Sequence, residues 1–128
     1  MTLPPKTAAL KAFLEAKPGA MTVPVSMPRG AAPVALMFKV MGKVFAILAL
    51  RRAEYVVLKC DPHLAEIMRE QYAGVGHRTH ADRRYWISVD LDADVPAEEI
   101  ERLAAHSYDL VSAGLSRKQK AELEALSS

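Results

Sequence analysis

Residues 34–50 read VALMFKVMGKVFAILAL, and this stretch decides the fold. Two runs rich in apolar and β-branched residues, Val34–Val40 and Lys43–Leu50, are separated only by Met41-Gly42. A glycine accepts the positive φ that a tight turn requires, so the pattern predicts a β-hairpin. A third such run, Tyr55–Lys59, follows after a short polar link. Because links this short join antiparallel neighbours, we expect a three-stranded meander.

The second strand of this meander is apolar on both of its faces. Successive side chains of a strand point to opposite faces. One face would therefore hold Val44, Ala46, Leu48 and Leu50, and the other Phe45, Ile47 and Ala49. We expect this strand to be central in the sheet and covered on both sides, or nearly so.

Upstream of the hairpin, the sequence predicts one helix and a proline-rich connection. Leu10, Phe13 and Leu14 share one helical face within residues 6–17, and Pro18-Gly19 ends that helix. The segment 18–33 contains four prolines and two glycines. Such a composition favours an irregular or extended connection, with a short edge strand around residues 21–25.

Downstream of the meander, Asp61-Pro62 is a strong helix start, with an aspartate N-cap and proline at the first helical position. This helix is predicted to run to about residue 72. Its expected buried stripe consists of Leu64, Ile67, Met68 and Tyr72. Residues 85–91 then alternate as a strand, with Tyr85, Ile87, Val89 and Leu91 on one side and Trp86, Ser88 and Asp90 on the other.

Two further helices complete the predicted order. Pro96 begins a helix that runs to about Ala113, and Ser116 with Gln119 matches a capping box for a last helix over residues 117–126. The fold class is therefore α+β, a single domain with an antiparallel sheet of at least four strands and helices on one face. The expected core is Val44, Phe45, Ile47, Leu48, Val57, Leu58, Leu64, Ile67, Met68, Ile87, Val89, Ile100, Leu103, Leu110 and Val111.

Length and composition fit one globular domain. The chain has 128 residues, of which 51% are hydrophobic and 25% charged, and single domains cluster at this size. No apolar run approaches the roughly 20 residues of a membrane helix, and we expect no signal peptide because the first residues lack an apolar segment. Cys60 is the only cysteine, so we expect a reduced, cytoplasmic protein.

The charge is distributed unevenly along the chain. Residues 1–60 hold nine Lys or Arg and two acids, residues 61–86 hold four of each, and residues 87–128 hold four basic and nine acidic side chains. Such a gradient would let one half meet a polyanion while the other half stays solvated. Surface carboxylates on C-terminal helices explain the same counts equally well.

Four motifs resemble one known family. The stretches FKVMGKVFAIL (38–48), LKCDP (58–62), HADRRYWISVDLD (80–92) and HSYDLVSAGL (106–115) are similar in order and spacing to the MmcQ/YjbR family. The resemblance implies a CyaY-like α+β fold and DNA binding through a double wing of two projecting loops. It assigns residues 1–128 to one domain. Within it, residues 34–128 match the family, and residues 1–33, the helix and proline-rich connection, depart from its pattern.

The basic residues form a candidate nucleic-acid interface. Several spaced cations contact phosphates without reading sequence, and a tryptophan can stack on a base. The candidate residues are Lys39, Lys43, Arg51, Arg52, Arg78, His80, Arg83, Arg84 and Trp86. We expect weak, mainly non-specific binding of double-stranded DNA. The family's basic loop, with Arg83 and Arg84, would form one wing, and Lys43 and Arg52 the other. An ordinary exposed sheet face also carries cations, and a single tryptophan on a strand is more often core.

Other site chemistries have weaker support. His77 and His80 are spaced as H-x-x-H, with Cys60 and His63 elsewhere. A zinc site uses three or four Cys or His ligands with closed spacing, so no metal site and no cofactor are expected. Cys60 ends an apolar strand, which predicts a buried, inert thiol. Since no phosphate loop, nucleophile elbow or paired-carboxylate signature occurs, we do not expect an enzyme.

The competing functional hypothesis is a non-enzymatic protein-interaction or scaffold module. In that case the basic strands would meet an acidic protein partner or a second copy of this chain. We expect a monomer or a weak homodimer and no membrane association.

Overall fold

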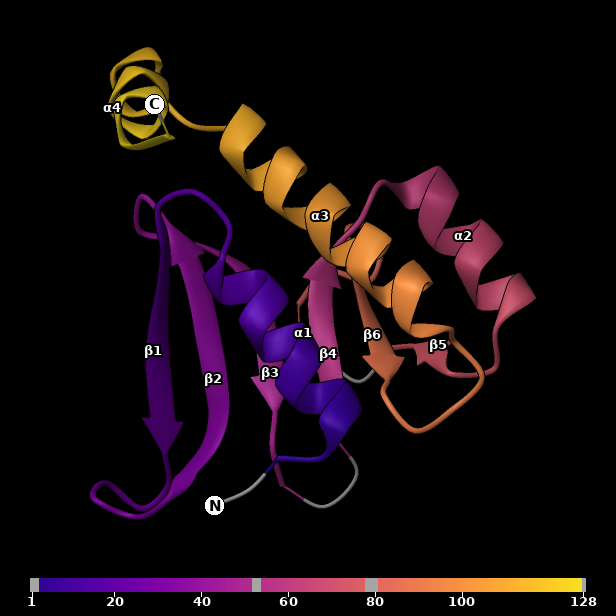
Figure 1. Cartoon of the computed structure of the whole chain (residues 1–128). Coiled ribbons are helices and arrows are strands. Elements are labelled where there is room, and N and C mark those ends of the chain that lie inside the picture. Colours follow the sequence, from indigo (N-terminus) through magenta and orange to yellow (C-terminus); the bar gives the residue numbers. More distant parts are fainter. Residues whose placement is uncertain (1–2, 52–53, 78–80, 128) are drawn as a thin grey trace.

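A six-stranded antiparallel sheet, in the order β1-β2-β3-β4-β6-β5, forms the centre of the molecule (Figure 1). The computed structural model describes residues 3–51, 54–77 and 81–127. The strands are β1 (Ala20–Ser26), β2 (Pro33–Val40), β3 (Lys43–Ala49), β4 (Tyr55–Lys59), β5 (Val75–Gly76) and β6 (Trp86–Asp90). The helices are α1 (Pro5–Glu15), α2 (Pro62–Gln71), α3 (Ala97–Ala113) and α4 (Arg117–Ser127). The predicted α+β fold, with an antiparallel sheet of at least four strands, is confirmed.

The turn between β2 and β3 has the geometry predicted from its glycine. Met41 has φ 49° and Gly42 has φ 81°. Two consecutive residues with positive φ in a two-residue loop define a type I′ turn, whose twist matches that of the strands it joins. The hairpin and meander predictions are confirmed by the register Val40 to Lys43 across this turn and by the pairing of β3 with β4.

A β-bulge places Phe45 on the face opposite to the one expected. Phe38 pairs with Ala46, but the next residue, Lys39, pairs with Val44, so Phe45 is an extra residue in β3. A bulge of this kind lets two consecutive side chains point the same way. The Phe45 ring stands edge-on to the ring of Tyr108 in α3, with centroids 5.2 Å apart. The strict alternation predicted for β3 is therefore wrong at this position.

One face of the sheet is covered by helices. In Figure 1, α1, α2 and α3 all lie on the same side of the strands. Buried strand side chains on that side are Leu36, Phe38, Val40, Phe45, Ala46, Leu48, Val56, Leu58, Ile87 and Val89. We call the other side the open face, because no helix covers it in the part of the chain that the structure describes. Ile47 and Ala49 lie there half-buried, so β3 is central but is not covered on both sides.

The buried stripe of α2 differs from the predicted one. Ala65 and Met68 are its buried residues, whereas Ile67 is 41% exposed. Ile67 and Ala65 are two positions apart, so they lie about 160° apart around the helix axis and cannot both face inward. Asp61 caps this helix as predicted, because its carboxylate accepts hydrogen bonds from the amides of His63 and Leu64, both at 3.1 Å.

Most of the remaining predicted core is confirmed. The members found buried are Phe45, Leu48, Val57, Leu58, Met68, Ile87, Val89, Ile100, Leu103 and Val111. Val44, Ile47, Leu64 and Leu110 are half-buried instead. Val44 and Ile47 belong to the strand without cover on its open face. Tyr108 of α3, which was not predicted to be core, is buried. Its hydroxyl donates a 2.5 Å hydrogen bond to the Pro18 carbonyl.

The ends of the molecule follow local signals. The Ser116 hydroxyl accepts a bond from the Gln119 amide at 3.1 Å, and the Gln119 side chain accepts from the Ser116 amide at 3.2 Å. This reciprocal pair is the predicted capping box of α4.

Within the described ranges, no helix combines the length and the apolar character needed to cross a bilayer.

Candidate functional site

Four basic residues lie at one end of the sheet, beside the β2–β3 turn. Lys39 is near the end of β2 and Lys59 ends β4, while Arg83 and Arg84 lie three and two residues before the start of β6. Because β6 runs antiparallel to β4, its first residue pairs with the last residue of β4. We call this group, at the upper end of the sheet in Figure 1, the basic end: Lys39, Lys59, Arg83 and Arg84.

The strand register places two of these cations and the only tryptophan on the open face. Trp86 pairs with Lys59 across β6 and β4. Their neighbours Ile87 and Leu58 also pair and are fully buried on the helix side. Since side chains alternate along a strand, Trp86 and Lys59 point to the open face, as does Lys39, the neighbour of buried Phe38. Trp86 is half-buried there, so it is not a core residue.

The segment that carries Arg83 and Arg84 is held by two sets of hydrogen bonds. The Asp82 carboxylate accepts from Nε and Nη2 of Arg84 at 3.2 and 3.0 Å, and from the Arg84 amide at 2.9 Å. From α2, Nη2 of Arg69 donates to the carbonyls of Arg83 at 2.8 Å and Trp86 at 3.2 Å. Hydrogen bonds thus hold the backbone of this segment both internally, through Asp82, and against the helix layer, through Arg69 of α2.

The titratable groups around this segment shift one another's pKa values. The hydrogen bonds from Arg84 lower the pKa of Asp82, and the same contact raises the pKa of Arg84. Desolvation, followed by the positive charges of Arg69 and Arg83, lowers the pKa of His77. His77 is therefore neutral at neutral pH. Part of the charge of Arg84 is already matched by Asp82.

The structure separates the other candidate residues. Lys43 lies at the same end, but its ammonium donates to the Gly114 carbonyl at the end of α3, at 3.2 Å. Arg51 follows β3 and lies at the opposite end of the sheet. Arg52, Arg78 and His80 lie outside the described residues. The second wing predicted from Lys43 and Arg52 stays a prediction, because Arg52 is not among the described residues.

The basic N-terminal half does not form one surface either. Its lysines in and after α1 have partners on the helix side. Lys6 donates to the Val95 carbonyl at 2.9 Å, Lys11 pairs with Glu15 at 2.9 Å, and Lys17 lies 4.8 Å from the ring centroid of Phe13. The charge gradient along the sequence therefore overstates the charge of any single face.

Apolar side chains continue the open face away from the basic end. Met21 pairs with Lys39, and Val23 pairs with Met37. Met21 is 67% exposed and Val23 37% exposed, while Met37 is half-buried. The edge strand around residues 21–25 was predicted, but its exposed apolar strip was not, because β1 lies in the proline-rich segment. The alternation Met21, Val23, Val25 was the signal that could have revealed it.

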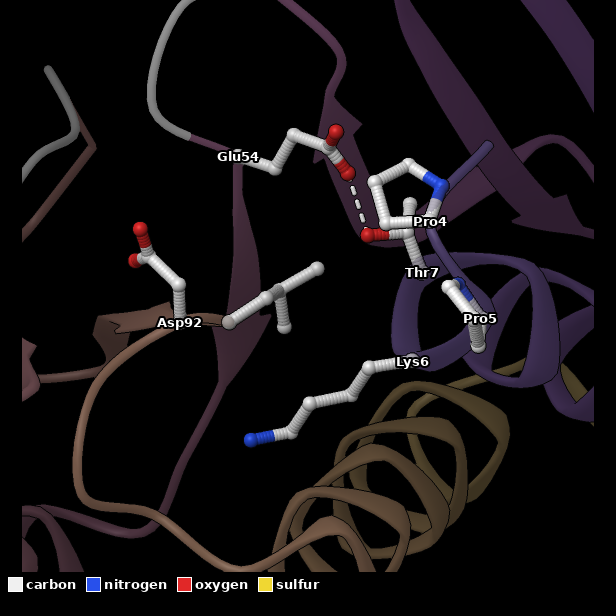
Figure 2. A pocket seen from close by; sticks show the side chains of 7 residues that line it. Pro4, Pro5, Lys6, Thr7, Glu54 and Asp92 are labelled. Carbon is white, nitrogen blue, oxygen red and sulfur yellow. Dashed lines mark hydrogen bonds between the residues drawn. The ribbon is translucent and has the colours of Figure 1, made fainter. Parts of the chain in front are cut away.

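A separate pocket of about 450 Å³ lies at the start of α1, next to the residue before β4 and the residues after β6 (Figure 2). Its walls are Pro4, Pro5, Lys6, Thr7, Glu54, Leu91 and Asp92. The Thr7 hydroxyl donates a short hydrogen bond to the Glu54 carboxylate, drawn as the dashed line. Three of its polar groups thus already have partners within the protein, since the Lys6 ammonium also donates to the Val95 carbonyl.

Metal and thiol chemistry find no geometric support. Among the described residues, no three His, Cys, Asp or Glu side chains are grouped so that they could hold a metal ion. His80, one member of the predicted H-x-x-H pair, lies outside those residues. Cys60 is buried as predicted. Burial, with the nearby charge of Asp61, raises the pKa of its thiol to about 11, so the reactive thiolate is scarce at neutral pH.

Comparison with known proteins gives a consistent family match. The family model described as YjbR matches residues 15–110. The uncharacterized protein YjbR of Escherichia coli K12 is 33% identical over 75 residues, which are 58% of this chain and 64% of that protein. The uncharacterized protein YbdF of Escherichia coli O157:H7 is 27% identical over 85 residues, which are 66% of this chain and 70% of that protein. The chain thus matches just under two thirds of the first relative's length.

Two solved structures share the fold. The Deinococcus radiodurans protein DR2400, which carries a DUF419 domain, aligns with a TM-score of 0.78 and 25% identity, over 91% of this chain and 86% of that one. A protein from Pseudomonas syringae aligns with a TM-score of 0.65 and 22% identity, over 80% of this chain and 96% of that one. The second likeness concerns the fold alone.

Proposed function

The chain belongs to the YjbR family, and we propose that it is a DNA-binding protein. It contacts phosphates weakly, without strong sequence preference, through the basic end of the sheet. The observation that carries this proposal is the register of β4 and β6, which brings Lys59 beside Trp86 and next to Arg83 and Arg84. Several spaced cations suit a polyanion, whose affinity rests on counterion release.

We propose that this function is binding alone and that the protein does not catalyse a reaction. The raised pKa of Cys60 argues against a thiolate nucleophile. The carboxylate of Asp82 is bound by Arg84, and that of Asp94 accepts hydrogen bonds from the amides of Ala73 and Gly74 at 2.8 and 2.7 Å. Such carboxylates act as structural acceptors, and their lowered pKa values do not suit a general acid.

The test is fluorescence anisotropy of a labelled 20-base-pair duplex at several salt concentrations. Log affinity should fall linearly with log salt, by about 0.9 for each phosphate contact. Arg83→Ala with Arg84→Ala should weaken binding to all sequences alike and flatten the slope by about two.

The matched control is Lys11→Ala with Arg102→Ala, which removes the same charge from the helix side. Both residues there have acidic partners, Glu15 at 2.9 Å and Glu99 at 3.1 Å. The control should bind as the unchanged protein does. Absence of binding of both the duplex and a single-stranded oligonucleotide at low salt, or equal losses in the two double variants, would overturn the proposal.

A second candidate function is interaction with an acidic protein. The exposed side chains of Met21 and Val23 favour it, because a strip of apolar residues beside Lys39 suits a partner with both apolar and acidic groups. Capture of such a partner should survive nuclease treatment and should be lost when Met21→Gln and Val23→Thr are combined. Size-exclusion chromatography with light scattering would show whether the partner is a second copy instead.

A further inference from the structure

We propose that the strand held at the basic end is single-stranded, with an unpaired base stacked on Trp86. This inference rests on the proposed function and names its ligand more narrowly. Trp86 lies half-buried on the open face, in register with Lys59. The exposed part of such a side chain can contact a flat ligand, and the cation beside it in the register can contact the phosphate backbone.

The cations are spaced across the strands rather than along them. Lys39 on β2 and Lys59 on β4 are separated by β3. Neighbouring strands lie about 4.8 Å apart, so the backbones at these two positions are roughly 10 Å apart. Trp86 is one strand further. A nucleic-acid strand lying across the sheet would therefore meet Trp86, Lys59 and Lys39 in turn, which combines an aromatic side chain for stacking with spaced cations for the phosphates.

A duplex does not fit this arrangement as well. The bases of a duplex are stacked on one another, and their edges are reached only by an element that enters a groove. Trp86 is the first residue of β6, pairs with Lys59 of β4 and is half-buried, so little of its side chain is available to enter a groove. A duplex could touch the four cations through its phosphates and leave Trp86 without a role.

Charge supports an anion at this end of the open face. The carboxylate on the open face of β6 is Asp90, four residues from Trp86 and thus about 13 Å away along the strand. The nearer carboxylate, Asp82, is bound by the guanidinium of Arg84. Arg84 itself lies 5.5 Å from the ring centroid of Tyr85, which is 43% exposed. The second aromatic ring therefore lies beside the same segment.

The first experiment uses Trp86 as its own probe, because it is the only tryptophan in the chain. Tryptophan emission is recorded during titration with a 12-nucleotide oligothymidine and, separately, with a 12-base-pair duplex. Stacking should quench the emission with the single strand, and the duplex should leave it nearly unchanged at equal saturation. Anisotropy of the same labelled oligonucleotides at one salt concentration should show tighter binding of the single strand.

The second experiment uses variants with labelled oligonucleotides. Trp86→Leu keeps an apolar side chain on the strand and should weaken single-strand binding about five- to tenfold, with duplex binding unchanged. Trp86→Phe should restore most of the loss. Lys39→Gln with Lys59→Gln should flatten the salt slope for the single strand by about 1.4, since each contact contributes about 0.7. Circular dichroism checks that each variant is folded.

The outcomes separate this inference from the proposed function. If duplex binds as tightly as the single strand and the emission stays constant, the single-strand inference is wrong and DNA binding stands. If neither form binds at low salt, both fall. If an acidic protein alone binds and quenches Trp86, the second candidate function replaces both.

Discussion

The hydroxyl of Ser107 donates a 2.5 Å hydrogen bond to the carbonyl of Phe45 at the bulge of β3. The same oxygen accepts from the amide of Lys59 at 2.8 Å. One buried side chain of α3 thus satisfies two backbone groups of neighbouring strands, where the bulge interrupts the ladder. It also fixes the end of β4 that carries a cation of the basic end.

Ser107→Ala should lower the free energy of unfolding by about 1–3 kcal/mol, because it leaves a carbonyl and an amide buried without partners. Urea unfolding followed by circular dichroism measures the change. Ser112→Ala, in the same helix, is the control, since its hydroxyl donates to the Asp109 carbonyl one turn back, at 3.2 Å. It should change stability by about 0.5 kcal/mol or less. Equal effects of the two variants would contradict the bridging role.

Gly74→Ala should destabilise the fold by about 1–3 kcal/mol through crowding. A Cβ at this position would lie 2.7 Å from the Cβ of Ala93 and 3.0 Å from a carboxylate oxygen of Asp94. Gly76→Ala is the matched control, because there the nearest atom, the Ser88 hydroxyl, is 3.8 Å away. Thermal melts of the two variants decide it. A Gly74→Ala protein as stable as the control would show that the loop beside Asp94 can move to accommodate the added methyl group.

Asp82→Asn should strengthen DNA binding about two- to fivefold at low salt, with the gain shrinking at high salt. The change removes the carboxylate that holds Arg84, at 3.0 Å between Nη2 and Oδ2, and leaves an oxygen to accept from the Arg84 amide. Asp92→Asn makes the same charge change in the pocket at the start of α1. Anisotropy should show no gain for that control. Equal gains would mean that only the net charge matters.

Cys60 should resist alkylation by iodoacetamide at pH 8 and react once urea unfolds the chain. Its pKa is raised from 9.0 to about 11 by burial. A pKa that is higher in the folded state favours the folded protein while the thiol is neutral. This contribution is complete below pH 9 and is lost as the pH rises through 11. Rapid native reaction at pH 8 would show that the thiol is accessible.

The strands and the turn were predictable because their signals are local. Gly42 and the alternation in β2 and β3 need no knowledge of the rest of the chain. The bulge at Phe45 was not predictable, since it depends on Tyr108 and Ser107 from a helix some sixty residues later. Exposure of Ile67 was missed for a similar reason, because composition alone does not show which side of α2 faces the sheet.

The candidate site was predictable in composition but not in arrangement. The run from Arg83 to Trp86 was recognised, and the structure places it beside Lys59. The sequence did not show that Asp82 holds Arg84, or that Lys43 donates to the end of α3. Net charge per segment counts cations without their partners. Only the register of strands distant in sequence decides which of them share a face.

The contact from Arg69 to the carbonyls of Arg83 and Trp86 has a consequence for how fast a ligand is captured. Because Arg69 of α2 already holds the backbone of residues 83–86, this segment needs no rearrangement when a ligand arrives. The conformational entropy of ordering it is lost during folding and not during association. Encounter should then be limited by diffusion and charge attraction. Differences in affinity between ligands should appear in how long each stays bound.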